Sequence, residues 1–316
     1  MTDITIIIPV YNAENEIEIC LESLINQINV NLELIIVDDC STDNTAKIIE
    51  TYHKSHKNIK TVYLKHNSGS GIARNEGLKY ISSDYVGFID SDDWVDLNFY
   101  KNLLYAAKQE ESDIVVAGIT NEYNNIASST LRYNYDSYTT ITGKTGLKLL
   151  TKSCDLGIFL SPIMNNKLYN TRFIQQHNIH CSDNISWQDD FFSFFAILHA
   201  QRITIVPNVQ YHYYQRQLSI THSATDSITK IDNCFDVLNK IKTELYSQKI
   251  YNTYQKDYNA FVERCITSLL YMLRREHLAK QNDNLAYLFD KIYQNYNIKD
   301  IIEYLDNERI YQFFNL

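Results

Sequence analysis

The sequence lacks a cluster of basic residues, a long apolar run and a leader before its first apolar segment. The formal net charge is −9, so no basic patch is available to neutralise nucleic-acid phosphates, and no nucleic-acid partner is expected. No apolar run approaches the roughly 18 residues that span a bilayer. Only three residues precede Ile4, too few for a secretion signal. We therefore expect a cytoplasmic protein, with peripheral association at the inner face of the membrane as the alternative.

Cysteine is present but lacks the spacing of a metal site or a redox pair. No CxxC pair and no His/Cys metal pattern occurs among the six cysteines. We expect free, buried or half-buried thiols in a reducing compartment. They are Cys20, Cys40, Cys154, Cys181, Cys234 and Cys265.

Apolar strands alternate with amphipathic helices through about residue 117, which predicts an α/β fold with a mainly parallel sheet. Expected strands are 4–9, 32–37, 61–64, 85–89 and 114–117. Residues 118–142, rich in Asn, Ser, Thr and Tyr, predict an irregular insertion. A Phe-rich helix at 191–200, a strand at 203–206 and a loop at 211–219 follow, and the pattern is helical from 227 onward.

Four polar signatures follow the expected strands of the first third of the chain. They are PVYN at 9–12, VDDCSTD at 37–43, GIARN at 71–75 and FIDSDDW at 88–94. Open α/β sheets bind ligands in the crevice outside the carboxyl ends of their strands. The ordered set therefore predicts a nucleotide-sugar pocket.

Each signature carries residues suited to one part of such a ligand. The D-x-D run Asp90 to Asp92 can hold a divalent cation that grips a diphosphate, although an isolated D-x-D is more often a capping turn. Asp39 can accept the imide N–H of uracil, or simply cap a turn. Arg74 opens a helix where it can meet phosphate oxygens. Because Arg74 also stands where a dinucleotide fingerprint needs its third glycine, that class is excluded.

Gln188, Asp189 and Asp190 precede the Phe-rich helix. A carboxylate there can be a general base or only a cap that complements the helix dipole. The dipole is expected to keep Asp189 ionised. His212 and His222 alone are more typical of ordinary loop histidines than of metal ligands.

Together these signatures resemble glycosyltransferase family 2, the inverting family with the GT-A fold. The resemblance implies a nucleotide-sugar sheet with flanking helices, to which a C-terminal helical appendage is added here. For the nucleotide, it implies that Pro9 and Tyr11 flank the base and that Asp39 binds uracil. It also implies that Asn67 and Arg74 lie along the nucleotide. Asp90 would reach the ribose side, and Asp92 would bind the metal. The catalytic base would be Asp189, with Gln188 replacing the family's usual glutamate and Asp190 as a rival. Arg216, Ser219 and a nearby histidine, His212 or His222, would approach the diphosphate.

The function implied is transfer of a sugar from a UDP-sugar to a hydroxyl acceptor, with Mn²⁺ or Mg²⁺ as cofactor. The acceptor would be a glycan, free or lipid- or protein-linked, in surface polysaccharide or glycan synthesis. A sugar-nucleotide nucleotidyltransferase and a non-catalytic nucleotide-sugar-binding subunit are the alternatives.

Two regions are expected. Residues 1–225 would form the catalytic domain, with nucleotide-sugar binding at 1–120 and the acceptor side and base at 121–225. Residues 226–316 would form the helical region, whose apolar stripe packs on the catalytic domain or, alternatively, mediates a homodimer or membrane-surface contact.

Overall fold

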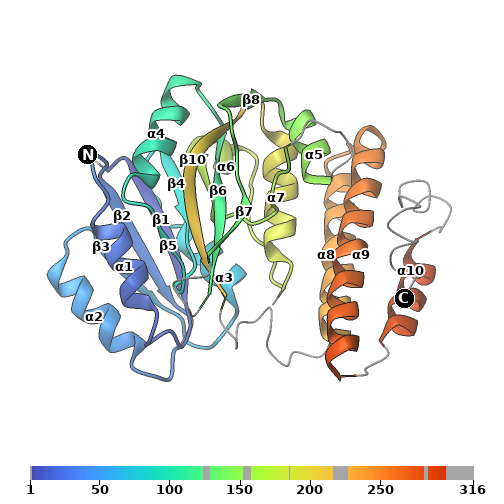
Figure 1. The fold of residues 1–316 in the computed structure, drawn as a ribbon, viewed down its shortest axis with the longest axis horizontal. Coiled ribbons are helices and arrows are strands. Elements are labelled where there is room, and N and C mark those ends of the chain that lie inside the picture. Colours follow the sequence, from blue (N-terminus) through green and yellow to red (C-terminus); the bar gives the residue numbers. More distant parts are fainter. Residues whose placement is uncertain are drawn as a thin grey trace. The chain divides into compact units, whose positions relative to one another are not determined.

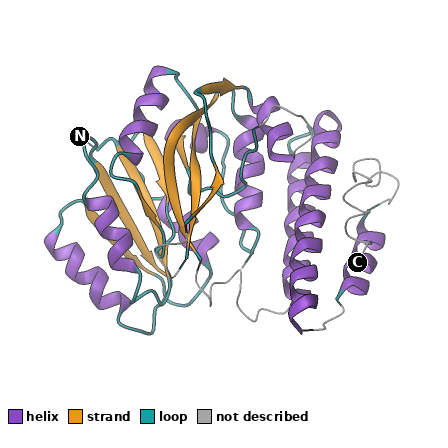
Figure 2. Cartoon of the chain, in the orientation of Figure 1, coloured by secondary structure: helices purple, strands orange, loops and turns teal. Residues whose placement is uncertain are grey.

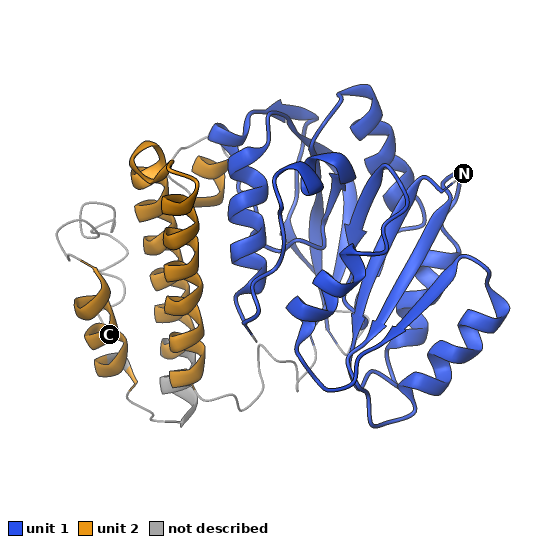
Figure 3. Ribbon diagram, turned by 180° about the vertical axis from the view of Figure 1, so that it is seen from behind, with its two compact units in different colours: residues 1–146, 158–223 blue, residues 147–157, 224–316 orange. Residues whose placement is uncertain are grey.

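The structure, a computed structural model, describes residues 2–123, 129–151, 158–184, 186–215, 227–280 and 284–296. It divides into two compact units, residues 1–146 with 158–223 and residues 147–157 with 224–316 (Figure 3). All the described strands lie in the first unit, and only helices are described in the second. Helix α5 (Gly143–Thr151) runs from the first unit into the second.

The first half of the sheet is parallel, as the alternating pattern predicts. Strands β1 (Ile4–Val10), β2 (Leu32–Asp38), β3 (Ile59–Tyr63) and β4 (Tyr85–Phe88) lie in the order β3-β2-β1-β4 (Figure 1). Every residue of β1 is buried, because helices cover both faces of this part of the sheet. The parallel strands bring their carboxyl ends, and the signatures that follow them, to one edge.

The second half of the sheet is mixed, which corrects the expectation of a mainly parallel sheet. Its strands are β5 (Trp94–Val95), β6 (Ile114–Glu122), β7 (Thr130–Tyr133), β8 (Thr139–Ile141), β9 (Lys167–Asn170) and β10 (Ile203–Tyr214). Strand β9 lies antiparallel between β4 and β6, and β10 is parallel to β6. A long crossover returns β9 to the middle of the sheet, and local periodicity carries no signal for such a pairing.

The prediction of an irregular insertion at 118–142 is wrong for the described residues of that range, which contain strands. Strand β6 continues to Glu122, and β7 and β8 add strands at its flank and beside β10 (Figure 2). Most residues of β7 are exposed, so its sequence is polar and lacks the alternation that marks a half-buried strand.

Helices cover both faces of the sheet in the first unit. Helices α1 (Ile17–Ile25), α2 (Thr45–Ser55) and α4 (Phe99–Gln109) contribute to the larger apolar core. Helices α3 (Ser70–Leu78), α6 (Thr171–Gln176) and α7 (Gln188–His199) complete the layer structure (Figure 1). Phe192 of α7 packs edge-on against Phe88 at 5.4 Å between ring centroids, which fixes α7 against the end of β4.

The second unit is a helical hairpin with a third helix beside it. It contains α8 (Ser227–Ser247), α9 (Tyr251–Lys280) and α10 (Leu285–Asn295). The apolar stripe of Phe261, Cys265, Leu269 and Leu273 is buried. Tyr258 of α9 donates a hydrogen bond to the carbonyl of Leu238 of α8 at 3.1 Å, so the two long helices pack together. Among the described residues, no helix combines the length and apolarity needed to cross a membrane.

Candidate active site

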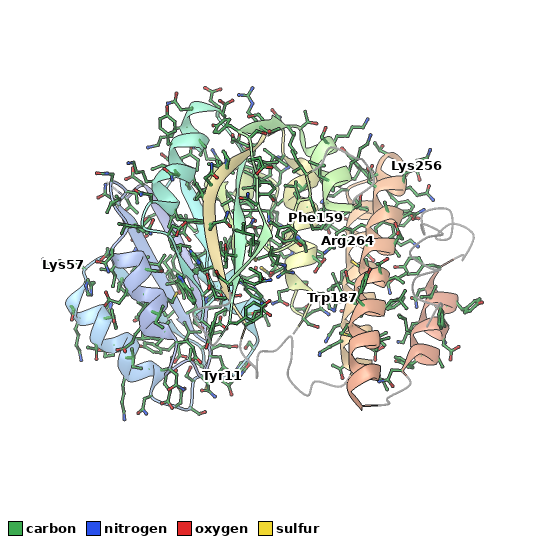
Figure 4. The ribbon with its side chains drawn as sticks, in the orientation of Figure 1. Tyr11, Lys57, Phe159, Trp187, Lys256 and Arg264 are labelled. Carbon is green, nitrogen blue, oxygen red and sulfur yellow. The ribbon has the colours of Figure 1, made fainter. Side chains whose placement is uncertain are left out.

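The first two signatures are joined by hydrogen bonds at the edge of the sheet. Tyr11 follows β1 with 45% of its surface exposed (Figure 4). Asn12, at a positive φ of 48°, donates its backbone N–H to Ser41 Oγ at 3.0 Å, and its Oδ1 accepts the backbone N–H of Thr42 at 2.8 Å. Pro9 is buried within β1. Ser41 and Thr42 thus stabilise the turn at Tyr11 and Asn12.

Asp39 is buried and anchors the loop that follows β3. Its two carboxylate oxygens accept the backbone N–H groups of Ser68 and Gly69, each at 2.7 Å. Gly69 has φ of +91°, a conformation that favours glycine. Asn67 is exposed in the same loop. Because each carboxylate oxygen has more than one acceptor position, Asp39 can hold this loop and still accept a further N–H.

The GIARN signature docks α3 against the segment that leads to α7. A Cβ on Gly71 would lie 2.5 Å from the carbonyl oxygen of Ser182, so only glycine permits this close approach. Asn75 both donates to the carbonyl and accepts from the N–H of Cys181, at 2.8 Å each. These contacts place the start of α7 beside the start of α3.

Arg74 joins the third and fourth signatures to the later acidic pair. Its side chain is 2% exposed, Nη2 donates to Asp90 Oδ1 at 2.6 Å, and Nη1 donates to Asp189 Oδ1 at 3.2 Å. Its Nε is buried without a hydrogen-bond partner among the described residues. The sequence predicted Arg74 along the nucleotide and Asp90 near the ribose; in the structure the two pair with each other.

Asp189, and not Asp190, is the carboxylate that Arg74 holds. Burial raises the pKa of Asp189 to about 6, while Arg74 opposes the increase and Asp90 adds to it. The pKa is raised because loss of solvent outweighs the opposing charge of Arg74, and a carboxyl with a pKa near 6 is still mostly ionised at neutral pH. Asp190 is buried in the first turn of α7.

Gln188 links the start of α7 to the start of α3. Its Nε2 donates to Ser70 Oγ at 2.8 Å, and its Oε1 is buried without a partner among the described residues. Where the resemblance leads us to expect a glutamate, the chain therefore carries a neutral side chain beside Asp189. No second carboxylate is added at this point of the site.

The acidic segment after β4 has the donor set of a divalent metal site. Carboxylate oxygens of Asp90, Asp92 and Asp93 lie within 4.8 Å of one another. Three neighbouring carboxylates fit Mg²⁺ or Mn²⁺, which prefer oxygen ligands and bind one or two carboxylates plus phosphate oxygens. The D-x-D residues predicted from sequence are thus brought together.

Asp93 and Tyr211 are site residues that the sequence did not single out. Asp93 is fully buried, and it accepts hydrogen bonds from the Tyr211 hydroxyl and, at 2.8 Å, from the backbone N–H of Tyr214. Burial, and then the charges of Asp92 and Asp90, raise the pKa of Asp93. Asp93 was visible in the acidic run, but its partner in β10 required the fold.

Lys167 is the other residue that the sequence did not single out. It is 1% exposed, and its Nζ donates to the Ser161 carbonyl at 2.8 Å, to the Ile163 carbonyl and to Asn166 Oδ1 at 2.9 Å. Burial lowers its pKa to about 7, and the charge of Asp189 opposes the decrease. In the sequence, the signal that could have identified Lys167 is its position at the start of an apolar strand.

His212 lies in strand β10, so the loop expected at 211–219 begins later than predicted. Its Nδ1 lies 2.7 Å from Glu122 Oε1 and its Nε2 lies 3.0 Å from Asp96 Oδ1. The imidazole also stacks on Trp94, with ring centroids 5.5 Å apart. His212 is therefore fixed near the C-terminal end of β10. Arg216, Ser219 and His222 lie outside the described residues.

Comparison with known proteins identifies the family. A family model described as Glycosyl transferase family 2 matches residues 5–181, more than half of the chain. The chain belongs to glycosyltransferase family 2. The matched region includes the four signatures, Arg74 and the acidic triad. The resemblance predicted from the signatures is thereby confirmed.

Several bacterial glycosyltransferases are similar to this family 2 chain. The putative glycosyltransferase EpsH of Bacillus subtilis is 30% identical over 213 residues, 66% of this chain and 60% of that protein. The poly(ribitol-phosphate) beta-N-acetylglucosaminyltransferase TarS of Staphylococcus aureus is 28% identical over 218 residues, 67% of this chain and 35% of that protein. The chain thus spans 60% or less of the length of these two relatives.

The fold is shared with a solved member of this group. The crystal structure of S. aureus TarS 1-349 in complex with UDP-GlcNAc matches with a TM-score of 0.63 and 21% identity, covering 96% of this chain and 89% of that one. The predicted GT-A fold with C-terminal helices is thereby confirmed.

The contacts of His212 predict a pH-dependent contribution to stability. Burial lowers its pKa, but hydrogen bonds to Asp96 and Glu122 outweigh burial and raise it above 6.5. A raised folded-state pKa stabilises the fold fully below about 6.5 and less as the pH rises through the folded-state value. We expect His212→Gln to lower the free energy of unfolding by about 2 kcal/mol at pH 6, and by clearly less at pH 9.

Denaturant unfolding at the two pH values measures this difference. The matched control is His66→Gln, which changes an exposed histidine of the same unit. A cost of His212→Gln that is equal at pH 6 and pH 9 would contradict the charged pairing.

Proposed function

We propose that this chain is an inverting glycosyltransferase that moves a sugar from a UDP-sugar to a hydroxyl group of an acceptor glycan. The observation that carries the proposal is the buried Arg74, which holds Asp189 and Asp90 together at the nucleotide edge of a family 2 fold. The TarS relative named as an N-acetylglucosaminyltransferase, and the UDP-GlcNAc complex of TarS, support a UDP-sugar donor and an acceptor from surface-polymer synthesis.

Asp189 would act as the general base. Its carboxylate takes the proton of the acceptor hydroxyl while the hydroxyl oxygen bonds to the anomeric carbon and the bond from that carbon to UDP breaks. Arg74 orients the carboxylate through Oδ1, which leaves Oδ2 to receive the proton. A base with a pKa near 6 is ionised at neutral pH and is still basic enough to accept a proton.

Asp92 would be the chief protein ligand of a divalent cation, with Asp90 and Asp93 beside it. Bound there, Mn²⁺ or Mg²⁺ would stabilise the negative charge that develops on the departing diphosphate. Arg74 and Tyr211 fix the positions of Asp90 and Asp93 before any ligand binds. Arg216, Ser219 and a histidine of the following segment are proposed as further diphosphate contacts.

The nucleotide would lie along the carboxyl ends of β1, β2 and β3. We propose that Pro9 and Tyr11 flank uracil, that Asp39 accepts its imide N–H and that Asn67 contacts the nucleotide. Two observations support this arrangement: Tyr11 is exposed, and Asp39 holds the loop at Ser68 through a hydrogen bond.

We propose that the first unit carries out catalysis on the cytoplasmic side, where UDP-sugars and reduced thiols coexist. The five cysteines described by the structure are free thiols, which supports a reducing compartment. For the helical unit we propose support of the catalytic unit, with self-association or membrane-surface contact as the alternatives.

The base assignment predicts opposite outcomes for two neighbouring substitutions. Asp189→Asn should lower kcat by a factor of about 10² or more and leave UDP affinity nearly unchanged, because it removes the proton acceptor while Arg74 keeps its ion pair with Asp90. Asp190→Asn changes a buried carboxylate and should mainly lower stability. UDP release, UDP calorimetry and thermal melting of both variants provide the measurement. A folded, inactive Asp190 variant beside an active Asp189 variant would move the assignment by one residue.

The raised pKa of Asp189 predicts the acid limb of the rate profile. The base works only when it is deprotonated, so kcat should be constant above the pKa and fall as the pH drops through about 6. The measurement is kcat from pH 5 to pH 8 with saturating donor. An acid limb centred near pH 4, typical of an exposed carboxyl, would contradict burial as the cause.

The acidic triad predicts a metal requirement that depends on Asp92. Asp92→Asn keeps the side-chain shape but removes one charge, so Mn²⁺-supported UDP binding and turnover should fall together, by about tenfold or more. Calorimetry of UDP with and without Mn²⁺ measures the first effect. Full activity of the variant with excess chelator would show that no metal is needed.

The position of Asp39 predicts selectivity for uridine. Asp39→Ala should weaken UDP binding by about 10- to 100-fold, because a charge-assisted hydrogen bond is lost, and should leave Mn²⁺ binding nearly unchanged. Since Asp39 also anchors the loop at Ser68 and Gly69, the melting temperature must be recorded in parallel. Unchanged UDP affinity, or tighter binding of GDP by the parent chain, would contradict a role in base recognition.

A further inference from the structure

We propose that Arg132, with the rings of Tyr133, Tyr213 and Phe159, forms an acceptor subsite for a sugar or polyol that carries an anionic group. The inference rests on the proposed function and names the chemical class of its acceptor. The four residues come from β7, from the end of β10 and from the segment that precedes β9.

The guanidinium of Arg132 is placed by aromatic rings. Its Cζ lies 5.5 Å from the ring centroid of Tyr133 and 5.6 Å from that of Tyr213. Cation–π contacts hold the charge beside the rings, and a guanidinium held in this way can still donate its N–H groups to a ligand. Arg132 is exposed, and within the described part of the chain no carboxylate pairs with it. In a chain of net charge −9, Arg132 is thus a positioned cation to which the described residues offer no acidic partner.

The cluster connects the two sides of the candidate active site. Tyr213 directly precedes Tyr214, whose backbone N–H donates to Asp93 of the acidic triad. On the other side, Tyr133 packs against Phe159 at 5.2 Å between ring centroids (Figure 4 labels Phe159). Phe159 begins the segment that Lys167 holds through the carbonyl of Ser161.

That segment in turn borders the proposed base. Ser193 of α7, one turn after Asp189, donates to the carbonyl of Pro162. The charge of Lys167 also acts on Asp189. A molecule resting on the aromatic cluster would therefore approach both the base and the donor, which is the place of an acceptor.

The chemistry of the cluster selects one class of molecule. Tyrosine and phenylalanine rings offer apolar faces to the C–H groups of a sugar or polyol. The guanidinium fork matches the two oxygens of a phosphate or a carboxylate in a bidentate, charge-assisted pair. A neutral acceptor would use only the rings, whereas an anionic acceptor would use the rings and the charge.

Binding of small probes to the whole chain tests the subsite apart from turnover. Saturation-transfer NMR with UDP and Mg²⁺ present would compare ribitol 5-phosphate, gluconate and neutral ribitol on the parent chain and on Arg132→Gln. Arg202→Gln is the matched control, since Arg202 is an exposed arginine next to the opposite end of β10, where its Nη1 donates to the Glu110 carbonyl.

The parent chain and the Arg202 control should bind at least one anionic probe about tenfold more tightly than ribitol, and Arg132→Gln should remove that preference. A preference for ribitol 5-phosphate alone assigns a phosphate-bearing acceptor, and a preference for gluconate assigns an acidic sugar. Equal binding of all three probes, or a preference that survives in Arg132→Gln, overturns the subsite. Separate UDP calorimetry on each variant reports on the donor site. A failure of the proposed function can therefore be distinguished from a failure of the subsite.

Discussion

The buried ion pairs of Arg74 are the constraint on which the rest of the site depends. Two carboxylates from elements far apart in sequence, Asp90 after β4 and Asp189 in α7, share one guanidinium that is almost excluded from water. Removing charges from water is costly, so such a group is stable only while its partners are in place. Gly71 and Asn75 of the same helix supply that condition, because they fix the segment before α7 against α3.

Three carboxylates of the acidic segment after β4 are each held by a different partner. Asp90 binds Arg74, Asp93 binds Tyr211, and Asp96 binds His212. Like charges so close repel one another, and distributing them among partners from α3 and β10 allows the segment to keep one conformation. The carboxyl edge of the parallel strands and the end of β10 are therefore connected through this segment, and the connection forms only when β10 lies beside β5.

The sequence allowed prediction of the parallel strands and the family, and it named most of the residues that we propose for the site, because apolar runs and the signatures that follow them are local. Asp92 and Asp189 could be named in this way. The contacts between these residues were not predictable from the sequence. Arg74 pairs with Asp90 and Asp189, and Asp93 binds Tyr211, because the strand order and the crossover connections bring distant segments together. The antiparallel return of β9, and with it buried Lys167, likewise depends on tertiary pairing that periodicity does not encode.

The same neighbours that position Asp189 also set its basicity. Burial alone would push its pKa well above that of an exposed carboxyl, and the Arg74 pair pulls it back, so the balance leaves a value of about 6. A second carboxylate at position 188 would add repulsion and raise the value further. Gln188 instead binds Ser70 without adding charge. The neutral Gln188 therefore links α7 to α3 without adding a negative charge, and Asp189, with a pKa of about 6, stays mostly ionised at neutral pH.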